Sequence, residues 1–290
     1  MSEDLLTVLV ITYNHAKYFR KCMENILSQK TSFGFKIYVL DDKSTDGTSD
    51  IVREYANKYP DKVVPFIREN NLGLEDNIYK GIESVQTKYY ATIESDDFWC
   101  DDSKLQKQVD ILENNPDCSF CGHNTIHNYP ENTGHKDNGK KFFKIKTQKF
   151  NFLKKNNKKK VVKVHLNSRV YRTSSLALDT IKNKAIPAWD STSYWWFLSK
   201  GNLYYIDEVM SVYNITDTGV YSGTSKEKKR LMAVKRITEI NKELEYKYNC
   251  FYVDALRRKK YLSFFKHIKL KYFTKLEKME QEYCKILGKL

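Results

Sequence analysis

Short apolar runs alternate with amphipathic segments through the first 117 residues of the chain. Residues 7–11 form a continuous apolar run, which is typical of a strand buried on both faces. The apolar residues of the next segment fall three or four positions apart, as on one stripe of a helix. They are Phe19, Cys22, Met23, Ile26 and Leu27. Asn14 is a candidate N-cap for this predicted helix.

The same pair of patterns occurs three more times. Strand-like runs at residues 36–40, 63–67 and 89–93 each precede a segment with helical periodicity. Four such alternations with short connections predict an α/β fold with a mainly parallel sheet covered by helices on both faces. Beyond residue 117 the pattern loosens. There the expected strands cover 118–126, 161–171 and 203–213, and the expected helices cover 174–181, 191–198 and the region from 225 onward.

Polar groups follow three of the predicted strands at the point where each strand ends. They are Thr12-Tyr13-Asn14, Asp41-Asp42 and Glu94-Ser95-Asp96-Asp97. Sheets of this kind bind ligands outside the carboxyl ends of their strands. We therefore expect the three groups to line one crevice, although they lie far apart in the sequence.

The third of these groups has three acids within four residues. Glu94, Asp96 and Asp97 would repel one another at a strand end unless a positive charge compensates them. Hard divalent cations take oxygen ligands, and Mg²⁺ needs only one or two protein carboxylates because it keeps most of its waters. The segment therefore predicts a site for Mg²⁺ or Mn²⁺ at the edge of the sheet.

Composition sets the broad class of protein. The 290 residues are 41% apolar, enough for one large domain or one domain with a smaller appendage. Residues 1–4 are acidic and the apolar run that follows is short, so no signal peptide is expected. We therefore expect a cytoplasmic protein whose six cysteines are reduced. The net charge of +14 is concentrated in two basic blocks, residues 136–163 and 226–290.

The order of these motifs resembles the family 2 glycosyltransferases of the GT-A fold, a Rossmann-like sheet flanked by helices. The motifs are Thr12-Tyr13-Asn14, Asp41-Asp42-Lys43-Ser44-Thr45-Asp46-Gly47-Thr48, Asn71-Leu72-Gly73 and Ser95-Asp96-Asp97. The resemblance continues through Asp190, Trp195-Trp196-Phe197-Leu198 and the stretch 205–213. It covers residues 5–224 and implies a glycosyltransferase domain over 1–224. Its expected halves are a nucleotide-binding half, 1–117, and an acceptor half, 118–224, followed by a basic helical region, 225–290.

The resemblance implies roles for the nucleotide-binding residues. Tyr13 would flank or stack on the base, and Asp42 would accept a hydrogen bond from a uracil ring nitrogen. Thr12, Asn14 and Asn71 belong to the same binding motifs. Turn chemistry is the structural alternative for Asp41-Asp42. His15 fits either a position near the nucleotide or a surface role.

The acidic group would divide its roles between ribose and metal. By resemblance, Asp97 is the direct metal ligand and Asp96 lies near the ribose or the metal. Glu94 stands where the family has Asp, and we consider it a sugar or acceptor contact. Tyr213-Asn214-Ile215-Thr216 occupies the place of a Tyr-Arg-x-His pattern that often supplies a further metal ligand in this family.

The resemblance also implies an inverting reaction with an acid as the general base. The matching residue is Asp190, which would take the proton from the attacking acceptor hydroxyl. A helix N-cap is the alternative role for Asp190, and both roles can hold at once. Trp189 stands where the family has Glu, and it would contact the sugar or the acceptor instead.

The resemblance thus implies an inverting transferase that moves a sugar from a UDP-sugar to a saccharide, lipid-linked or free, and it is the sole ground for expecting a role in bacterial surface glycan assembly. The basic C-terminal block is either a solvated helical surface or a peripheral membrane contact on the inner face of the cytoplasmic membrane. Nucleic acid is disfavoured because the acidic crevice would repel phosphate. A sugar-nucleotide nucleotidyltransferase is the alternative enzyme, but residues 13–17 lack the glycine-rich phosphate loop that it needs. A basic adaptor without enzymatic activity is the third alternative.

Overall fold

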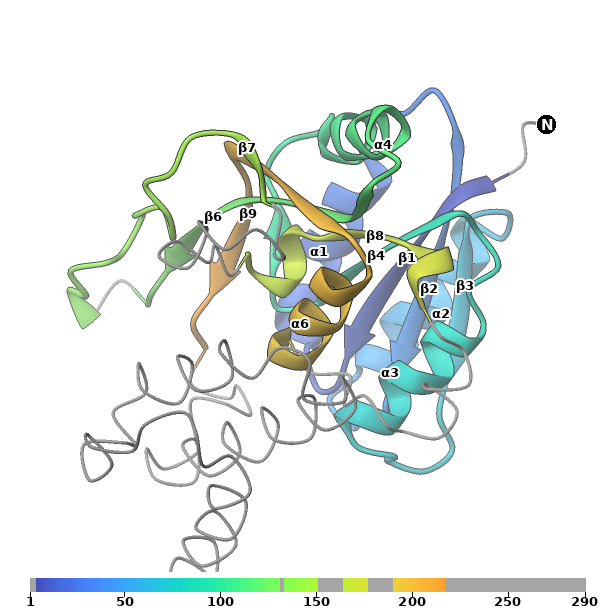
Figure 1. Ribbon diagram of the computed structural model, residues 1–290. Coiled ribbons are helices and arrows are strands. Elements are labelled where there is room, and N and C mark those ends of the chain that lie inside the picture. The colour runs from blue at the N-terminus through green and yellow to red at the C-terminus, as the bar shows by residue number, and fades with distance from the viewer. Residues whose placement is uncertain (1–3, 131–132, 151–163, 177–189, 217–290) are drawn as a thin grey trace, which may run out of the picture. The chain divides into compact units, whose positions relative to one another are not determined.

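The computed structural model describes residues 4–130, 133–150, 164–176 and 190–216, and of residues 190–192 it describes the backbone alone (Figure 1). A mixed sheet forms the centre of this part of the chain. Its strands follow the order β3-β2-β1-β4-β8-β6-β9-β5, and β7 pairs with β9. The strands are β1 (Asp4–Thr12), β2 (Gly34–Asp41), β3 (Val63–Ile67), β4 (Tyr89–Glu94), β5 (Phe98–Trp99), β6 (Cys118–Asn128), β7 (Gln148–Phe150), β8 (Val170–Arg172) and β9 (Asn202–Asn214).

Helices lie on both faces of this sheet. In Figure 1, α3 and α6 lie in front of it, and α1 and α2 lie behind it. The helices are α1 (Ala16–Leu27), α2 (Thr48–Lys58), α3 (Leu74–Glu83), α4 (Lys104–Asn114) and α6 (Asp190–Lys200), with short 3₁₀ turns η3 (Leu166–Ser168) and η4 (Thr173–Ser175). None of these described helices combines the length and the apolar composition that crossing a lipid bilayer requires.

The first half of the sheet is parallel, as the sequence predicts. β1 lies between β2 and β4 and is parallel to both, so every residue from Leu6 to Thr12 is buried. The predicted stripe of α1 packs into the core through Phe19, Cys22, Met23 and Ile26. β8 then joins β4 to β6 through antiparallel pairs, and β6 and β9 are parallel again. The predicted α/β class, with helices flanking a largely parallel sheet, is confirmed.

Two local predictions change. Of the strand expected at 161–171, the described residues 164–171 contain only the first two residues of β8, because residues 166–168 form η3. Asn167 N–H and Ser168 N–H turn back toward His165, which closes this 3₁₀ turn. Of the helix expected at 174–181, residues 174 and 175 belong to η4, Leu176 follows this turn, and residues 177–181 lie outside the described part. The same holds for the domain boundary near 224 and for the basic region 225–290.

Candidate functional site

The carboxyl ends of three parallel strands bring the polar groups together. Thr12 lies opposite Asp41 across β1 and β2, and Ile11 lies opposite Glu94 across β1 and β4. The backbone continues this pairing beyond the strands, since Asp42 N–H donates to the Thr12 carbonyl at 3.1 Å and Ser95 N–H donates to the Ile11 carbonyl at 2.9 Å. The expectation that these groups meet at one edge of the sheet is confirmed.

The loop after β1 is fixed by the loop after β2. Asn14 has a left-handed backbone, with φ of 56°, and its Oδ1 accepts the Thr45 N–H at 2.7 Å. Its own N–H donates to Ser44 Oγ at 2.9 Å. The prediction that Asn14 caps α1 is wrong, because His15 occupies the N-cap position and no side chain caps the helix there. Tyr13 stands out from this loop with 44% of its surface exposed.

Asp42 holds the loop that precedes α3. Its Oδ1 accepts the Leu72 N–H at 2.7 Å, and its Oδ2 accepts the Gly73 N–H at 2.9 Å. The Asn71 side chain donates to the Asp42 carbonyl at 3.1 Å. Gly73 has a φ of 80°, a conformation that favours glycine. Each carboxylate oxygen has a second lone pair, so Asp42 can hold this loop and still accept a hydrogen bond from a ligand.

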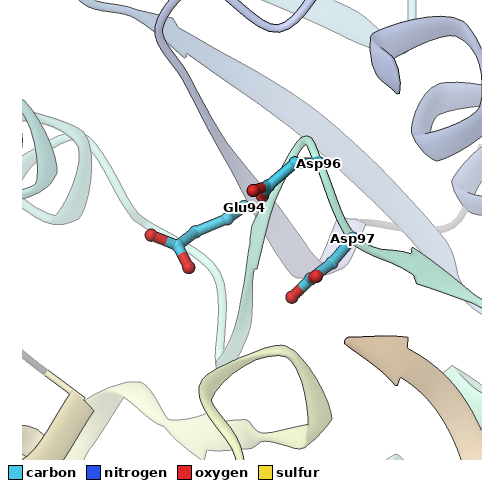
Figure 2. A group of neighbouring side chains, drawn as sticks. All are labelled: Glu94, Asp96 and Asp97. Atoms are coloured by element: carbon cyan, nitrogen blue, oxygen red, sulfur yellow. The ribbon is translucent and has the colours of Figure 1, made fainter. Parts of the chain in front are cut away.

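The three acids gather at the end of β4 and in the turn that follows it (Figure 2). Glu94, Asp96 and Asp97 each offer a carboxylate oxygen, and these oxygens lie within 4.8 Å of one another. Asp97 is 1% exposed. Burial raises the pKa of its carboxyl well above its usual range, and the charges of Asp96 and Glu94 raise it further. Burial also raises the pKa of Asp96.

Two asparagines orient the Asp97 carboxylate. Asn167 Nδ2 donates to Asp97 Oδ2 at 2.8 Å, and the Asn214 backbone N–H donates to Oδ1 at 2.9 Å. The Asn214 side chain also donates to the Asp96 carbonyl. No motif in the sequence marks Asn167 as part of the site. Asn214 lies in the segment that departs from the Tyr-Arg-x-His pattern, and this departure is the signal that the sequence offers for it.

His15 lies on the other side of the acidic group. Its Nδ1 is 2.9 Å from Ser95 Oγ, which donates to Thr12 Oγ1 at 2.7 Å. Its Nε2 lies 4.0 Å from Asp96 Oδ2. A positive charge on this ring stabilises the Asp96 carboxylate. It therefore opposes the effect of burial and lowers the pKa of Asp96. Of the two roles considered for His15, this position favours proximity to the nucleotide site.

The donor set fits a hard divalent cation. Asp96 Oδ1 is buried and has no hydrogen-bond partner among the described residues. Three carboxylates this close together, one of them buried and two partly buried, are stabilised as anions by a cation, which also replaces the missing hydrogen bond. Oxygen ligands of this kind suit Mg²⁺ and Mn²⁺. Asp97 and Asp96 are the residues that would hold the ion.

The other predicted residues are placed less fully. Asp190 is the first residue of α6, in agreement with a position at the start of a helix, and its side chain lies outside the described part. Trp189 lies outside the described residues altogether. The structure thus brings Thr12, Asn14, Asp42 and the acids together, and leaves the roles of Asp190 and Trp189 as predictions.

Known proteins resemble part of this chain. The family described as "Glycosyl transferase family 2" matches residues 7–174. The putative teichuronic acid biosynthesis glycosyltransferase TuaG of Bacillus subtilis is 31% identical over 125 residues, 43% of this chain and 48% of TuaG. The putative glycosyltransferase EpsH of the same organism is 30% identical over 123 residues, 42% of this chain and 35% of EpsH. The matches therefore span less than half of the length of these curated relatives.

Solved structures show the same fold. S. aureus TarS in complex with UDP-GlcNAc superimposes with a TM-score of 0.59 at 18% identity, over 83% of this chain and 67% of TarS. The mannosyltransferase PcManGT of Pyrobaculum calidifontis, in complex with GDP-Man and Mn²⁺, gives a TM-score of 0.55 at 15% identity, over 83% of this chain and 64% of PcManGT. Both likenesses support the GT-A fold.

The family match contains β1, β2, β4 and the polar groups that follow them, and it covers more than half of the chain. The chain therefore belongs to glycosyl transferase family 2.

Proposed function

We propose that the protein is an inverting glycosyltransferase that uses a UDP-sugar, a divalent metal ion and a saccharide acceptor. One observation carries this proposal. The three clustered carboxylates lie at the same edge of the sheet as Asp42 and Tyr13. Groups suited to a metal ion with a diphosphate therefore lie beside groups suited to a nucleotide base.

The nucleotide would bind across the ends of β1 and β2. Tyr13 is exposed and offers a ring face for the uracil. Asp42, held by the loop at 71–73, would accept the hydrogen bond of the uracil ring nitrogen. Thr12, Asn14 and Asn71 would shape this pocket through the loop contacts described above. A cation held by Asp97 and Asp96 would neutralise the diphosphate of the donor as it leaves.

Asp190 is the proposed general base. It would accept the proton of the acceptor hydroxyl while the hydroxyl oxygen bonds to the anomeric carbon and the bond from that carbon to the diphosphate breaks. The attack from the opposite face inverts the anomeric centre. Glu94 and Trp189 would contact the transferred sugar or the acceptor.

The names of the relatives support the proposed acceptor class. TuaG is named for teichuronic acid biosynthesis, and TarS has been solved with UDP-GlcNAc. PcManGT was solved with a GDP-sugar, so UDP rests here on the proposed pairing of uracil with Asp42. We propose a role in bacterial surface polysaccharide or glycoconjugate synthesis, with a saccharide acceptor that a lipid carries.

The basic region 225–290 would then dock the cytoplasmic enzyme on the anionic membrane that holds such an acceptor. Sedimentation with liposomes tests this part. Binding to vesicles with phosphatidylglycerol, lost at high salt and absent with neutral phosphatidylcholine vesicles, supports it. Failure to bind either kind of vesicle, or equal binding to both kinds, contradicts it.

A screen of UDP-sugars for metal-dependent hydrolysis tests the catalytic proposal. One UDP-sugar should release UDP in Mn²⁺ or Mg²⁺ and not in EDTA. With that donor and an accepting saccharide, Asp190→Asn should lose transfer and keep its affinity for UDP. Normal turnover by Asp190→Asn would show that another group is the base, and absence of hydrolysis or transfer with every UDP-sugar would contradict the proposed donor class.

A further inference from the structure

Asn167 lies in a buried network that ends on the proposed metal ligand. The residue is 1% exposed and belongs to η3, which precedes β8. Its Nδ2 donates to Asp97 Oδ2 at 2.8 Å. Its Oδ1 accepts the hydroxyl of Ser211, on β9, at 3.0 Å. The side-chain amide therefore joins the turn after β4 to the last strand of the sheet.

Neighbouring groups fix the orientation of this amide. Thr125 Oγ1 lies 2.8 Å from Ser211 Oγ and 3.5 Å from Asn167 Oδ1. Trp99 Nε1 donates to the Asn167 carbonyl at 2.8 Å, which holds the backbone of the turn. A flipped amide would point its oxygen at the Asp97 carboxylate, and two acceptors without a proton between them repel. The amide nitrogen consequently faces Asp97.

Two donors then hold the Asp97 carboxylate from different elements. Asn167 binds one oxygen and the Asn214 backbone N–H binds the other. Together they fix the rotation of the carboxylate and support its ionised form in a buried place. Each oxygen keeps one lone pair for a cation.

We propose that Asn167 is a positioning residue, which holds the Asp97 carboxylate ready for the divalent ion. This inference rests on the metal site of the proposed function. Outer groups that hydrogen-bond to ligating side chains commonly change metal affinity 10- to 100-fold when they are replaced. Asn167 carries out this task through Asp97 and needs no contact with substrate.

Mn²⁺ binding in the presence of UDP, followed by electron paramagnetic resonance, tests the proposal without turnover. Asn167→Leu keeps the approximate size of the side chain and removes its hydrogen bonds. We expect it to weaken Mn²⁺ binding at least tenfold. The affinity for UDP in EDTA should stay within about twofold, because Asn167 makes no contact with the residues proposed to bind the base. Asn124→Leu is the matched control. It removes an equally buried amide whose nitrogen donates to the Phe143 carbonyl and to Asp207 instead of to Asp97, so Mn²⁺ affinity should not change.

Asn167→Ser is the second variant in case Asn167→Leu does not fold. Its hydroxyl is too short to replace the amide, so the same loss of Mn²⁺ affinity is expected. Unchanged Mn²⁺ affinity in a folded variant overturns the inference. An equal loss of UDP affinity in EDTA also overturns it, because that result shows a general loss of structure. A wild-type protein whose UDP binding is independent of Mn²⁺ would instead overturn the metal site of the proposed function.

Discussion

Asp42 accepts the backbone N–H of Gly73 at 2.9 Å, and this hydrogen bond ties the end of β2 to the start of α3. The other oxygen of Asp42 accepts the N–H of Leu72. Asp42, which the sequence predicts to bind the base of the nucleotide, therefore also stabilises the loop at residues 72–73. A ligand that binds Asp42 meets a carboxylate whose position is already fixed.

Asp42→Asn should destabilise the protein as well as weaken UDP binding. The new amide nitrogen would face a backbone N–H, and one partly buried donor would lose its acceptor. The expected loss in the free energy of unfolding is about 1–3 kcal/mol. Urea denaturation measures it. Asp50→Asn is the control, because the Asp50 carboxylate is largely exposed and pairs with Arg53 on the surface of the same helix. Equal stabilities of the two variants would show that the hydrogen bonds from Leu72 and Gly73 to Asp42 contribute little to the free energy of unfolding.

Tyr13→Ala should weaken UDP binding without affecting the fold. The side chain is largely exposed, so its removal leaves no cavity. Stacking of a base on an aromatic ring contributes about 1–3 kcal/mol, so the dissociation constant for UDP should rise by about 5- to 150-fold. Tyr13→Phe keeps the ring and should bind UDP nearly as well as the wild type. Calorimetric titration separates the two variants, and wild-type affinity in Tyr13→Ala would remove Tyr13 from the base site.

Lys104 should make the stability of the protein depend on pH. Its ammonium lies 3.9 Å from the centre of the Trp99 ring, is buried, and has no hydrogen-bond partner among the described residues. Burial lowers the pKa of Lys104 from 10.5 to about 7. Between these two values the unfolded chain binds more protons than the folded one. The free energy of unfolding should therefore rise with pH in this window, by at most about 1.4 kcal/mol per pH unit.

Lys104→Met tests this pH dependence. The variant should be more stable than the wild type at pH 7, and the difference should shrink as the pH approaches 10. Lys80→Met, which replaces an exposed lysine on α3, supplies the comparison for pH effects elsewhere in the protein. A constant difference between Lys104→Met and the wild type across this range would mean that Lys104 does not change its charge there.

The pattern of the sequence was sufficient for the parallel half of the fold. The continuous apolar run at residues 7–11 predicts a strand of a parallel sheet that is buried on both faces. The carboxyl ends of parallel strands lie at the same edge of their sheet. The pattern alone therefore predicts that Asp42 and Asp97 lie at one edge of the sheet. The periodicity of α1 likewise identified the residues that pack against the sheet.

The supports of the site were not predictable in the same way. Asn167 and Asn214 are 70 and 117 residues from Asp97, and their roles arise only when β8 and β9 close the sheet. A single asparagine in a polar segment carries no periodic signal. The turn at η3 depends on local hydrogen bonds to His165. The composition of residues 161–171 is typical of a strand and does not predict this turn.

The central claim is that the acids after β4 bind a metal ion together with UDP. Calorimetric titration of UDP into the wild type and into Asp97→Asn, each with Mn²⁺ and with EDTA, tests it most directly. We predict that Mn²⁺ tightens UDP binding in the wild type, that Asp97→Asn loses this gain, and that the two proteins bind UDP alike in EDTA. Full Mn²⁺-dependent binding in Asp97→Asn would contradict the account.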